Sequence, residues 1–145
     1  MEIRYIEYGT KEYDENVELR IEVLRRPHKC GMDEEERQFE KEGAPILGLY
    51  EKGKMIGSGV MACIDKDQIE VRYMAVREGY RGKGAGNFLM DEMEDYGRKN
   101  NYKKVFLVSR TSALPFYEKR GYKKIGEAYE PDFVPVMHIH MEKKL

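Results

Sequence analysis

The chain has 145 residues, of which 41% are hydrophobic and 37% charged, and this is enough for a single packed domain, 1–145, beneath a heavily charged surface. No run of residues approaches the roughly 18 consecutive apolar positions of a membrane span, and no basic segment leads into an apolar run as a secretory signal does. Cys30 and Cys63 are too few cysteines for a disulfide-bonded scaffold, so we expect a cytoplasmic protein with free thiols and no membrane partner.

The 26 basic and 27 acidic residues nearly cancel, which argues against a dedicated nucleic-acid binder. The two halves differ, however: residues 1–72 carry a net charge of −5 and residues 73–145 carry +4. The positive half is consistent with a solvated surface or with a local attraction for a small polyanion, such as a nucleotide or a coenzyme.

The first third of the chain predicts one strand and two helices. Residues 2–8 alternate between apolar and polar side chains, as a half-buried strand does. Residues 13–26 place apolar side chains at helical spacing, and Pro27 stops the helix. Residues 32–42 predict a short, very acidic helix whose charges we expect to form a solvated face, with attraction of a cationic amine as the alternative.

Two-residue alternation or short buried runs predict six more strands, at 45–51, 55–64, 68–76, 103–108, 122–129 and 134–142. The first three of these follow one another through tight turns and predict an antiparallel meander. A helix is predicted from Gly84 to Asn100, where apolar residues recur at spacings of three and four. Thr111 or Ser112 is expected to cap a further helix, which Gly121 ends. This order of elements predicts a mixed α/β domain.

The segment from Ala75 to Met90, AVREGYRGKGAGNFLM, carries the strongest indication of function. A strand ends here, glycine occupies three alternate positions, and a helix begins at once. Glycines let a ligand approach the backbone closely, and the free N–H groups and the dipole at the start of a helix favour a phosphate. Arg81 and Lys83 add two positive charges. The pattern predicts a site for a phosphate-bearing ligand, with a purely structural strand-to-helix turn as the alternative.

The spacing of the three glycines limits which phosphate ligand is bound. A dinucleotide fingerprint from Gly82 would need a glycine where the chain has Asn87, and no window supplies a P-loop. The spacing that fits is R-x-x-G-x-G, formed by Arg81, Gly84 and Gly86.

With these residues the chain resembles the GNAT superfamily of acyl-CoA-dependent N-acyltransferases. Two segments carry the resemblance: Met74-Ala75-Val76 followed by Arg81-Gly82-Lys83-Gly84-Ala85-Gly86, and Ala113 to Tyr122, which is similar to A-x-x-F-Y-x-x-x-G-[F/Y]. The resemblance covers most of the chain and is strongest from Ile69 to Tyr122. The residues from Gly126 to Met141 are further similar to a bacterial subgroup of unassigned substrate.

The resemblance implies the GNAT fold, an α/β fold whose mixed, mostly antiparallel sheet splays between strands 4 and 5 and is flanked by about four helices. It implies acetyl-CoA as co-substrate and no metal. The Met74 amide would stabilise the oxyanion formed during acyl transfer, and a homodimer is a possible assembly. The pantetheine arm would lie as an added strand beside Met74, Ala75 and Val76. The coenzyme pyrophosphate would lie on the backbone amides of Arg81, Gly82, Lys83, Gly84, Ala85 and Gly86.

The resemblance also supplies a candidate acid and a candidate base. Tyr117 matches the family tyrosine that lies near the coenzyme sulfur and protonates it; a tyrosine packed between helix and sheet is the alternative. Glu70, four residues before Met74, has the spacing of the catalytic glutamate of the histone acetyltransferase branch. Strand alternation places Glu70, Arg72 and Met74 on one face, so an ion pair with Arg72 is the alternative role of Glu70.

Two histidines near the C-terminus are further candidates. His138 and His140 share one face of the last predicted strand, and with His28 and Cys30 they have the ligand types of a metal site. Nothing in the sequence brings these residues together, so we expect no metal. We expect instead that His138 lines the acceptor pocket or assists proton removal.

Arg25 and Arg26 precede Pro27 in a region that shapes the acceptor site in the GNAT family. An arginine there would suit an acceptor with a carboxylate or a phosphate, but a solvated surface position is favoured for both. Cys63 is expected to be a small core residue of its strand.

The sequence thus predicts a cytoplasmic N-acetyltransferase that moves an acetyl group from acetyl-CoA to a primary amine by direct attack in a ternary complex. The acceptor and the acyl-chain preference stay open, with succinyl-CoA as a rival donor. A non-catalytic acyl-CoA-binding sensor or interaction module on the same fold is the alternative from another class.

Overall fold

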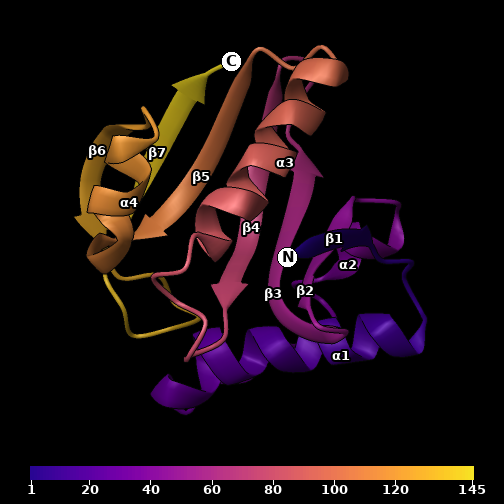
Figure 1. The fold of residues 1–145 in the computed structure, drawn as a ribbon. Coiled ribbons are helices and arrows are strands. Elements are labelled where there is room, and N and C mark those ends of the chain that lie inside the picture. The colour runs from indigo at the N-terminus through magenta and orange to yellow at the C-terminus, as the bar shows by residue number, and fades with distance from the viewer.

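The computed structural model describes residues 1–145 and contains one seven-stranded sheet with helices packed against both of its faces (Figure 1). The sheet order is β1-β2-β3-β4-β5-β7-β6, and every neighbouring pair is antiparallel except β4 and β5. The predicted fold class is therefore confirmed. The strands are β1 (Glu2–Tyr5), β2 (Ile46–Glu51), β3 (Lys54–Cys63), β4 (Gln68–Val76), β5 (Lys104–Arg110), β6 (Lys123–Tyr129) and β7 (His138–Lys144).

Four α-helices flank the sheet: α1 (Lys11–Arg20), α2 (Gln38–Lys41), α3 (Ala85–Lys99) and α4 (Leu114–Lys119). The Thr10 side chain caps α1 by accepting a hydrogen bond from the Tyr13 amide. The helix continues as a π-helical turn, Ile21–Arg25, and a 3-10 turn, Arg26–His28, that contains Pro27, so the helical run ends one residue beyond the proline that was predicted to stop it. None of the helices combines the length and the apolar character needed to cross a membrane.

Two hydrophobic cores, one on each face of the sheet, hold the helices in place. On one face, α3 buries Leu89 and Met93 against sheet residues that include Leu107. On the other face, Leu19 of α1 packs with Val60 of β3. Because alternate residues of β3 enter different cores, seven consecutive residues of this strand are buried. The centre of the sheet is thus covered on both sides.

The parallel strands β4 and β5 separate partway along their length, as the resemblance implies. They pair only as far as Val71 and Leu107. Just beyond, the ladder between β3 and β4 is interrupted between Ser58 and Val60, and Tyr73 of β4 has a positive φ of 52°. This irregularity is a β-bulge, which bends a strand and redirects its side chains. The bulge and the end of pairing open the sheet near its centre.

The bulge corrects the predicted alternation of β4. Strict alternation would place Glu70, Arg72 and Met74 on one face. The extra residue at Tyr73 instead turns Met74 to the side of α3, next to Gly86. Glu70 and Arg72 stay on the opposite side of the strand, because Ile69 and Val71 occupy the α3 core.

The acidic segment before β2 is only in part the solvated helix expected from the sequence: Glu34, Glu35 and Glu42 are exposed, but Glu40 is buried. Only the four residues of α2 are helical, and turns precede them. The Glu40 side chain is fully buried and pairs with Arg20 at 2.7 Å, and Glu36 pairs with Arg25 at 2.7 Å. A buried carboxylate needs such a partner. Both arginines come from α1 and the turn that follows it, so local sequence does not reveal the pairing.

Three smaller predictions are also corrected. Cys63 is exposed at the end of β3 and is not a core residue. Thr111 and Ser112 belong to a 3-10 turn, and neither side chain caps α4. The last strand begins at His138 and not at residue 134, because Pro135 lacks the N–H group that a strand ladder requires.

Candidate active site

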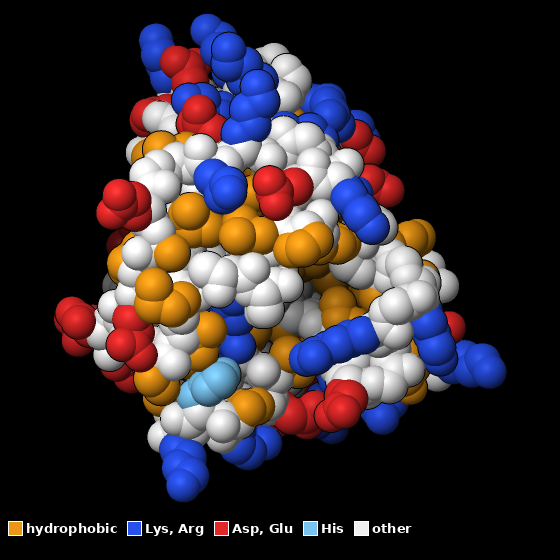
Figure 2. Space-filling model, turned by 90° about the vertical axis from the view of Figure 1, so that its left-hand side faces the viewer, with side chains coloured by type: hydrophobic (Ala, Val, Ile, Leu, Met, Phe, Trp, Pro, Cys, Tyr) orange, Lys and Arg blue, Asp and Glu red, His pale blue; other side chains and the backbone are white.

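The opening between β4 and β5 leads into a cavity of about 380 Å³. Its walls come from the turn after α1, the acidic segment, the strands β4 and β5, the start of α4 and the segment between β6 and β7. Three predicted site residues, Glu70, Met74 and Tyr117, all line it. From the side of α4 and β6 the molecule is hollowed, with hydrophobic side chains inside the hollow and Lys or Arg side chains at its edge (Figure 2).

Tyr117 lies on α4 with only 7% of its surface exposed. Its ring is fixed in edge-to-face contacts with Phe116, at 5.0 Å between centroids, and with Tyr122, at 5.6 Å. Burial raises the pKa of Tyr117 well above its ordinary value, against a smaller opposing effect of Arg120. The hydroxyl is therefore protonated at neutral pH, and it can donate a proton into the cavity.

Glu70 lies on β4 with 21% of its side chain exposed. The nearest basic group is Arg72, whose Nε lies 3.9 Å from the Glu70 carboxylate. Burial raises the pKa of Glu70 and outweighs the lowering effect of Arg72. The ion pair anticipated from the sequence is present, but it is loose, and it leaves the carboxylate able to accept a proton.

His138, the first residue of β7, lines the cavity, whereas His140 does not. The His138 Nδ1 lies 2.6 Å from the Val136 carbonyl oxygen, which assigns the proton to Nδ1 and leaves Nε2 as an acceptor. Burial lowers the pKa of His138, and Arg110 and Arg25 lower it further, against the opposing effect of the Val136 hydrogen bond. The imidazole is therefore neutral at neutral pH.

Arg25 lines the same cavity and is buried, contrary to the solvated position favoured from the sequence. The Glu36 carboxylate accepts two hydrogen bonds from its guanidinium, at 2.8 and 2.7 Å. The guanidinium carbon also lies 4.9 Å from the centroid of the Phe133 ring. Arg26 is exposed and does not line the cavity.

The cavity contains residues that sequence reasoning did not single out. Arg110, the last residue of β5, lines it together with Tyr129 and Phe133. Arg110 donates a hydrogen bond to the Leu24 carbonyl oxygen and lies 3.4 Å from the His28 ring. In the sequence Arg110 lies just beyond the predicted strand 103–108, where a charged side chain is ordinary, so no local signal points to it.

The glycine turn between β4 and α3 needs all three of its glycines. Gly82 and Gly84 have φ of 77° and 82°, a left-handed conformation that favours glycine. At Gly86 a side chain would meet the Phe116 ring, which lies 3.0 Å from the position of a Cβ. Gly84 is the N-cap of the 15-residue helix α3, so the first N–H groups of the helix lack intrahelical acceptors. The turn thus offers free backbone donors.

Arg81 and Lys83 are exposed in the glycine turn. The Arg81 Nε donates to the Val76 carbonyl oxygen at 3.2 Å, and the Lys83 ammonium lies over the Tyr80 ring. Other basic side chains gather at the opposite end of the sheet, where β5 begins and β7 ends (top of Figure 2). Only part of the positive charge of residues 73–145 therefore lies at the glycine turn.

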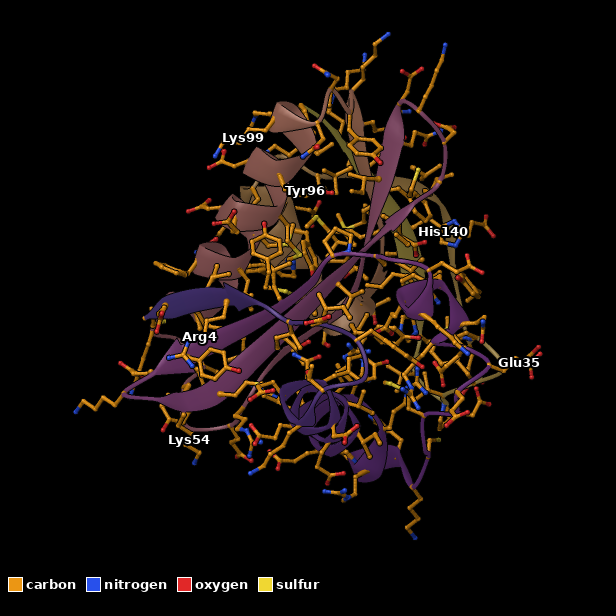
Figure 3. The ribbon with its side chains drawn as sticks, turned by 90° about the vertical axis from the view of Figure 1, so that its right-hand side faces the viewer. Arg4, Glu35, Lys54, Tyr96, Lys99 and His140 are labelled. Carbon is orange, nitrogen blue, oxygen red and sulfur yellow. The ribbon has the colours of Figure 1, made fainter.

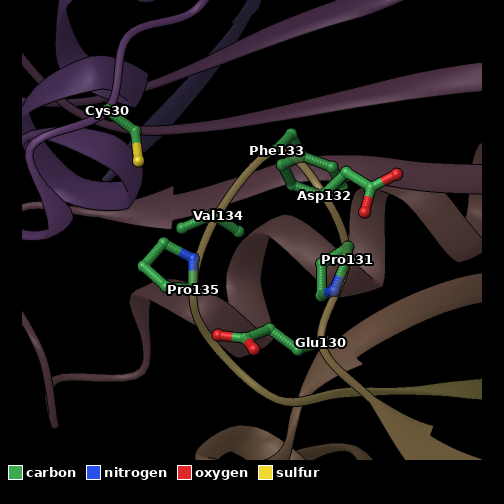
Figure 4. Close-up of a pocket in the computed structure, with 7 residues that line it drawn as sticks. All are labelled: Cys30, Glu130, Pro131, Asp132, Phe133, Val134 and Pro135. Carbon is green, nitrogen blue, oxygen red and sulfur yellow. The ribbon is translucent and has the colours of Figure 1, made fainter.

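A second hollow, of about 310 Å³, lies inside the loop between β6 and β7 (Figure 4). The loop residues 130–135 line it, with Cys30 on the other side. Phe133 also lines the cavity at β4 and β5, so this loop contributes to both. No three His, Cys, Asp or Glu side chains gather in the structure as a candidate metal site.

Comparisons with known proteins agree with this architecture. A family model for the GNAT acetyltransferase domain matches residues 13–145. An uncharacterized N-acetyltransferase of Bacillus subtilis (strain 168), YitI, is 26% identical over 148 residues, which cover 97% of each chain.

Two solved structures have the same fold at low sequence identity. An acyl-CoA N-acyltransferase from Pseudomonas aeruginosa superposes with a TM-score of 0.81 at 19% identity over 99% of both chains. A GNAT family acetyltransferase from Elizabethkingia anophelis with acetyl-CoA bound gives a TM-score of 0.75 at 19% identity, over 99% of this chain and 97% of that one. Almost the whole chain is covered, so the matched region includes the opening between β4 and β5.

Proposed function

The chain belongs to the GNAT family of acyl-CoA-dependent N-acyltransferases, and from this we propose that it transfers an acetyl group from acetyl-CoA to a primary amine. The observation that carries the proposal is the cavity where β4 and β5 separate, because Glu70, Met74 and Tyr117 all line it. Aminolysis of a thioester requires a proton acceptor, a donor to the carbonyl oxygen and a proton donor. Glu70 is the proposed proton acceptor, the Met74 N–H the proposed donor to the carbonyl oxygen, and Tyr117 the proposed proton donor.

The coenzyme is held by the glycine turn and by the free edge of β4. Its pyrophosphate lies on the backbone N–H groups from Arg81 to Gly86, at the start of α3. Its pantetheine arm runs beside Met74 to Val76, where β4 no longer pairs with β5. The Elizabethkingia anophelis neighbour, whose structure contains acetyl-CoA, supports an acyl-CoA as the co-substrate.

Transfer proceeds by direct attack of the neutral amine on the thioester carbonyl carbon. The Met74 N–H donates a hydrogen bond to the carbonyl oxygen and stabilises the negative charge that develops there. Glu70 accepts a proton from the attacking nitrogen, directly or through water, and His138 is the alternative acceptor. As the C–S bond breaks, Tyr117 gives its proton to the coenzyme sulfur and is reprotonated from solvent. The products are the N-acetylated amine and CoA.

Release of the CoA thiol tests this function. Purified protein with acetyl-CoA and a panel of primary amines should release thiol in an amine-dependent manner, and mass spectrometry should detect the N-acetylated amine. Succinyl-CoA in parallel compares the two donors. Binding of acetyl-CoA without release for any amine would instead support the non-catalytic sensor.

Charge reversal in the glycine turn, Arg81→Glu, should weaken acetyl-CoA binding by roughly 10- to 100-fold, because an attractive charge beside the pyrophosphate becomes a repulsive one. Isothermal titration calorimetry measures the affinity. Lys99→Glu makes the same charge change at the far end of α3 (Figure 3) and should bind acetyl-CoA like the unmodified protein. Equal affinity in the two variants would show that the phosphates lie elsewhere.

The pH dependence of kcat at saturating amine identifies the base. Burial raises the pKa of Glu70, and only its carboxylate form accepts a proton, so kcat should rise with pH through that raised pKa. Glu70→Gln should lower kcat by about 100-fold or more and abolish the rise. His138→Gln should leave the midpoint of the rise in place. A midpoint that disappears in His138→Gln and survives in Glu70→Gln would make His138 the base.

A further inference from the structure

Three arginines line the cavity, and two of them are matched by carboxylates of the same wall. Arg25 pairs with Glu36 at 2.7 Å, and Arg72 has Glu70 at 3.9 Å. The third arginine, Arg110, takes part in no salt bridge.

A carbonyl oxygen and a histidine ring contact Arg110 instead. Its Nη2 donates to the Leu24 carbonyl oxygen in the turn after α1, and its Nη1 lies 3.4 Å from the His28 Nε2. Burial and the positive charges of Arg25 and Arg81 lower the pKa of Arg110. A guanidinium nevertheless stays charged in a protein. This part of the cavity therefore contains a positive charge that no acidic side chain compensates.

The cavity also contains one carboxylate without a basic partner. Asp33 lines it and accepts a hydrogen bond from the Glu36 amide, but it forms no salt bridge. The unmatched charges of the cavity are thus one positive, on Arg110, and one negative, on Asp33, and the two do not pair with each other. Asp33 is exposed to solvent, so a ligand with an anionic group, which would complement Arg110, is what this arrangement favours.

We infer that the acceptor is a small amine that also carries a carboxylate, as an amino acid does, and that Arg110 binds this carboxylate. This inference rests on the proposed acetyl transfer. The planar guanidinium offers parallel N–H donors that match the two oxygens of a carboxylate. The cavity of about 380 Å³ must also admit the acetyl end of the coenzyme, so the part of the acceptor that enters it is small.

The coenzyme is the competing partner for Arg110, because Arg81 of the glycine turn acts on its charge. Kinetics separate the two roles. A residue that binds the acceptor changes the KM for the acceptor, whereas a residue that binds the coenzyme changes the KM for acetyl-CoA.

The test compares acceptors that differ only in the negative charge. Free amino acids and their amino amides are assayed for CoA thiol release at saturating acetyl-CoA, with rates corrected for the fraction of neutral amine. The unmodified protein should prefer at least one amino acid over its amide by about 10- to 100-fold in kcat/KM, as for a charge-assisted hydrogen-bonded pair. Arg110→Gln should abolish most of this preference and leave the KM for acetyl-CoA unchanged. Arg110→Lys, which keeps the charge, should retain part of it.

Arg26→Gln is the matched control, because Arg26 is exposed and lies outside the cavity. Arg26→Gln should keep the full preference for an amino acid over its amino amide.

A binding measurement on the unmodified protein does not depend on how the variants fold. N-acetyl amino acids and N-acetyl amino amides, which resemble the two classes of product, are titrated into the protein in the presence of CoA. Tighter binding of an acid than of its amide supports the inference. No preference for any acid in either assay, or an Arg110→Gln variant altered only in its KM for acetyl-CoA, would overturn it. Failure of the acetyl transfer itself has a different signature, namely no binding of acetyl-CoA or no thiol release with any amine.

Discussion

Replacing Tyr117 by phenylalanine should lower kcat for acetyl transfer by roughly 100-fold or more, the usual contribution of a general acid. The change removes only the hydroxyl, so the ring can keep its contacts with Phe116 and Tyr122. Without a proton donor the thiolate of CoA has to leave as an anion or take its proton from water. Affinity for acetyl-CoA should stay the same within about twofold, because the hydroxyl acts on the transition state.

Steady-state kinetics and a coenzyme titration on the same preparation separate the possible outcomes for Tyr117. Tyr5→Phe is the matched control, because the exposed Tyr5 donates its hydroxyl hydrogen bond to Glu92 and does not line the cavity. An unchanged kcat in Tyr117→Phe would refute the role as acid. A loss confined to coenzyme affinity would make Tyr117 a binding residue.

The largest effect on the free energy of unfolding is expected from breaking the buried ion pair between Arg20 and Glu40, which lies next to Tyr73 of the bulge. Arg20 and Glu40 are both fully buried, and the Glu40 carboxylate accepts two hydrogen bonds from Arg20, at 2.8 and 2.7 Å. Glu40→Ala leaves the guanidinium buried without a counter-charge. This should reduce the free energy of unfolding by about 3–5 kcal/mol, the cost of breaking a buried pair from one side.

Urea unfolding of Glu40→Ala measures this loss, and an unchanged slope against urea would show that the shift in midpoint reports a change in stability. Glu35→Ala is the control, because Glu35 is exposed at the surface in the same acidic segment (Figure 3) and should change stability by less than about 0.5 kcal/mol. The Arg20 guanidinium also lies 4.9 Å from the Tyr73 ring at the bulge. Equal stability of the two variants would mean that water reaches the buried pair.

Local patterns predicted most of the fold and the glycine turn between β4 and α3. Alternation, short buried runs and helical spacing gave every strand and helix in the right order, because most elements bury one face or both against the two cores. The glycine turn was predicted correctly because its requirements are local: a left-handed φ at Gly82 and Gly84, and close packing at Gly86. The gathering of Glu70, Met74 and Tyr117 in one cavity followed from the resemblance alone, since Tyr117 is more than 40 residues from the other two in the chain.

The predictions that the structure corrected failed because contacts between distant parts of the chain decide these features. The bulge at Tyr73 moves Met74 to the other face of β4, and no residue pattern within the strand announces it. The acidic segment was expected to be solvated because its partners, Arg20 and Arg25, lie on another element. Arg110 was missed because its significance depends on the absence of a partner, and only a three-dimensional arrangement reveals that.

Calorimetric titration of the purified protein with acetyl-CoA tests the central claim most directly. The claim is that the glycine turn and the opening between β4 and β5 bind an acyl-CoA. Acetyl-CoA and CoA should each bind one site with micromolar affinity, whereas NADH, a dinucleotide whose fingerprint the turn lacks, should give no heat of binding. No binding of acetyl-CoA would contradict the account, because the turn would then only join a strand to a helix, and the proposed acetyl transfer would have no donor.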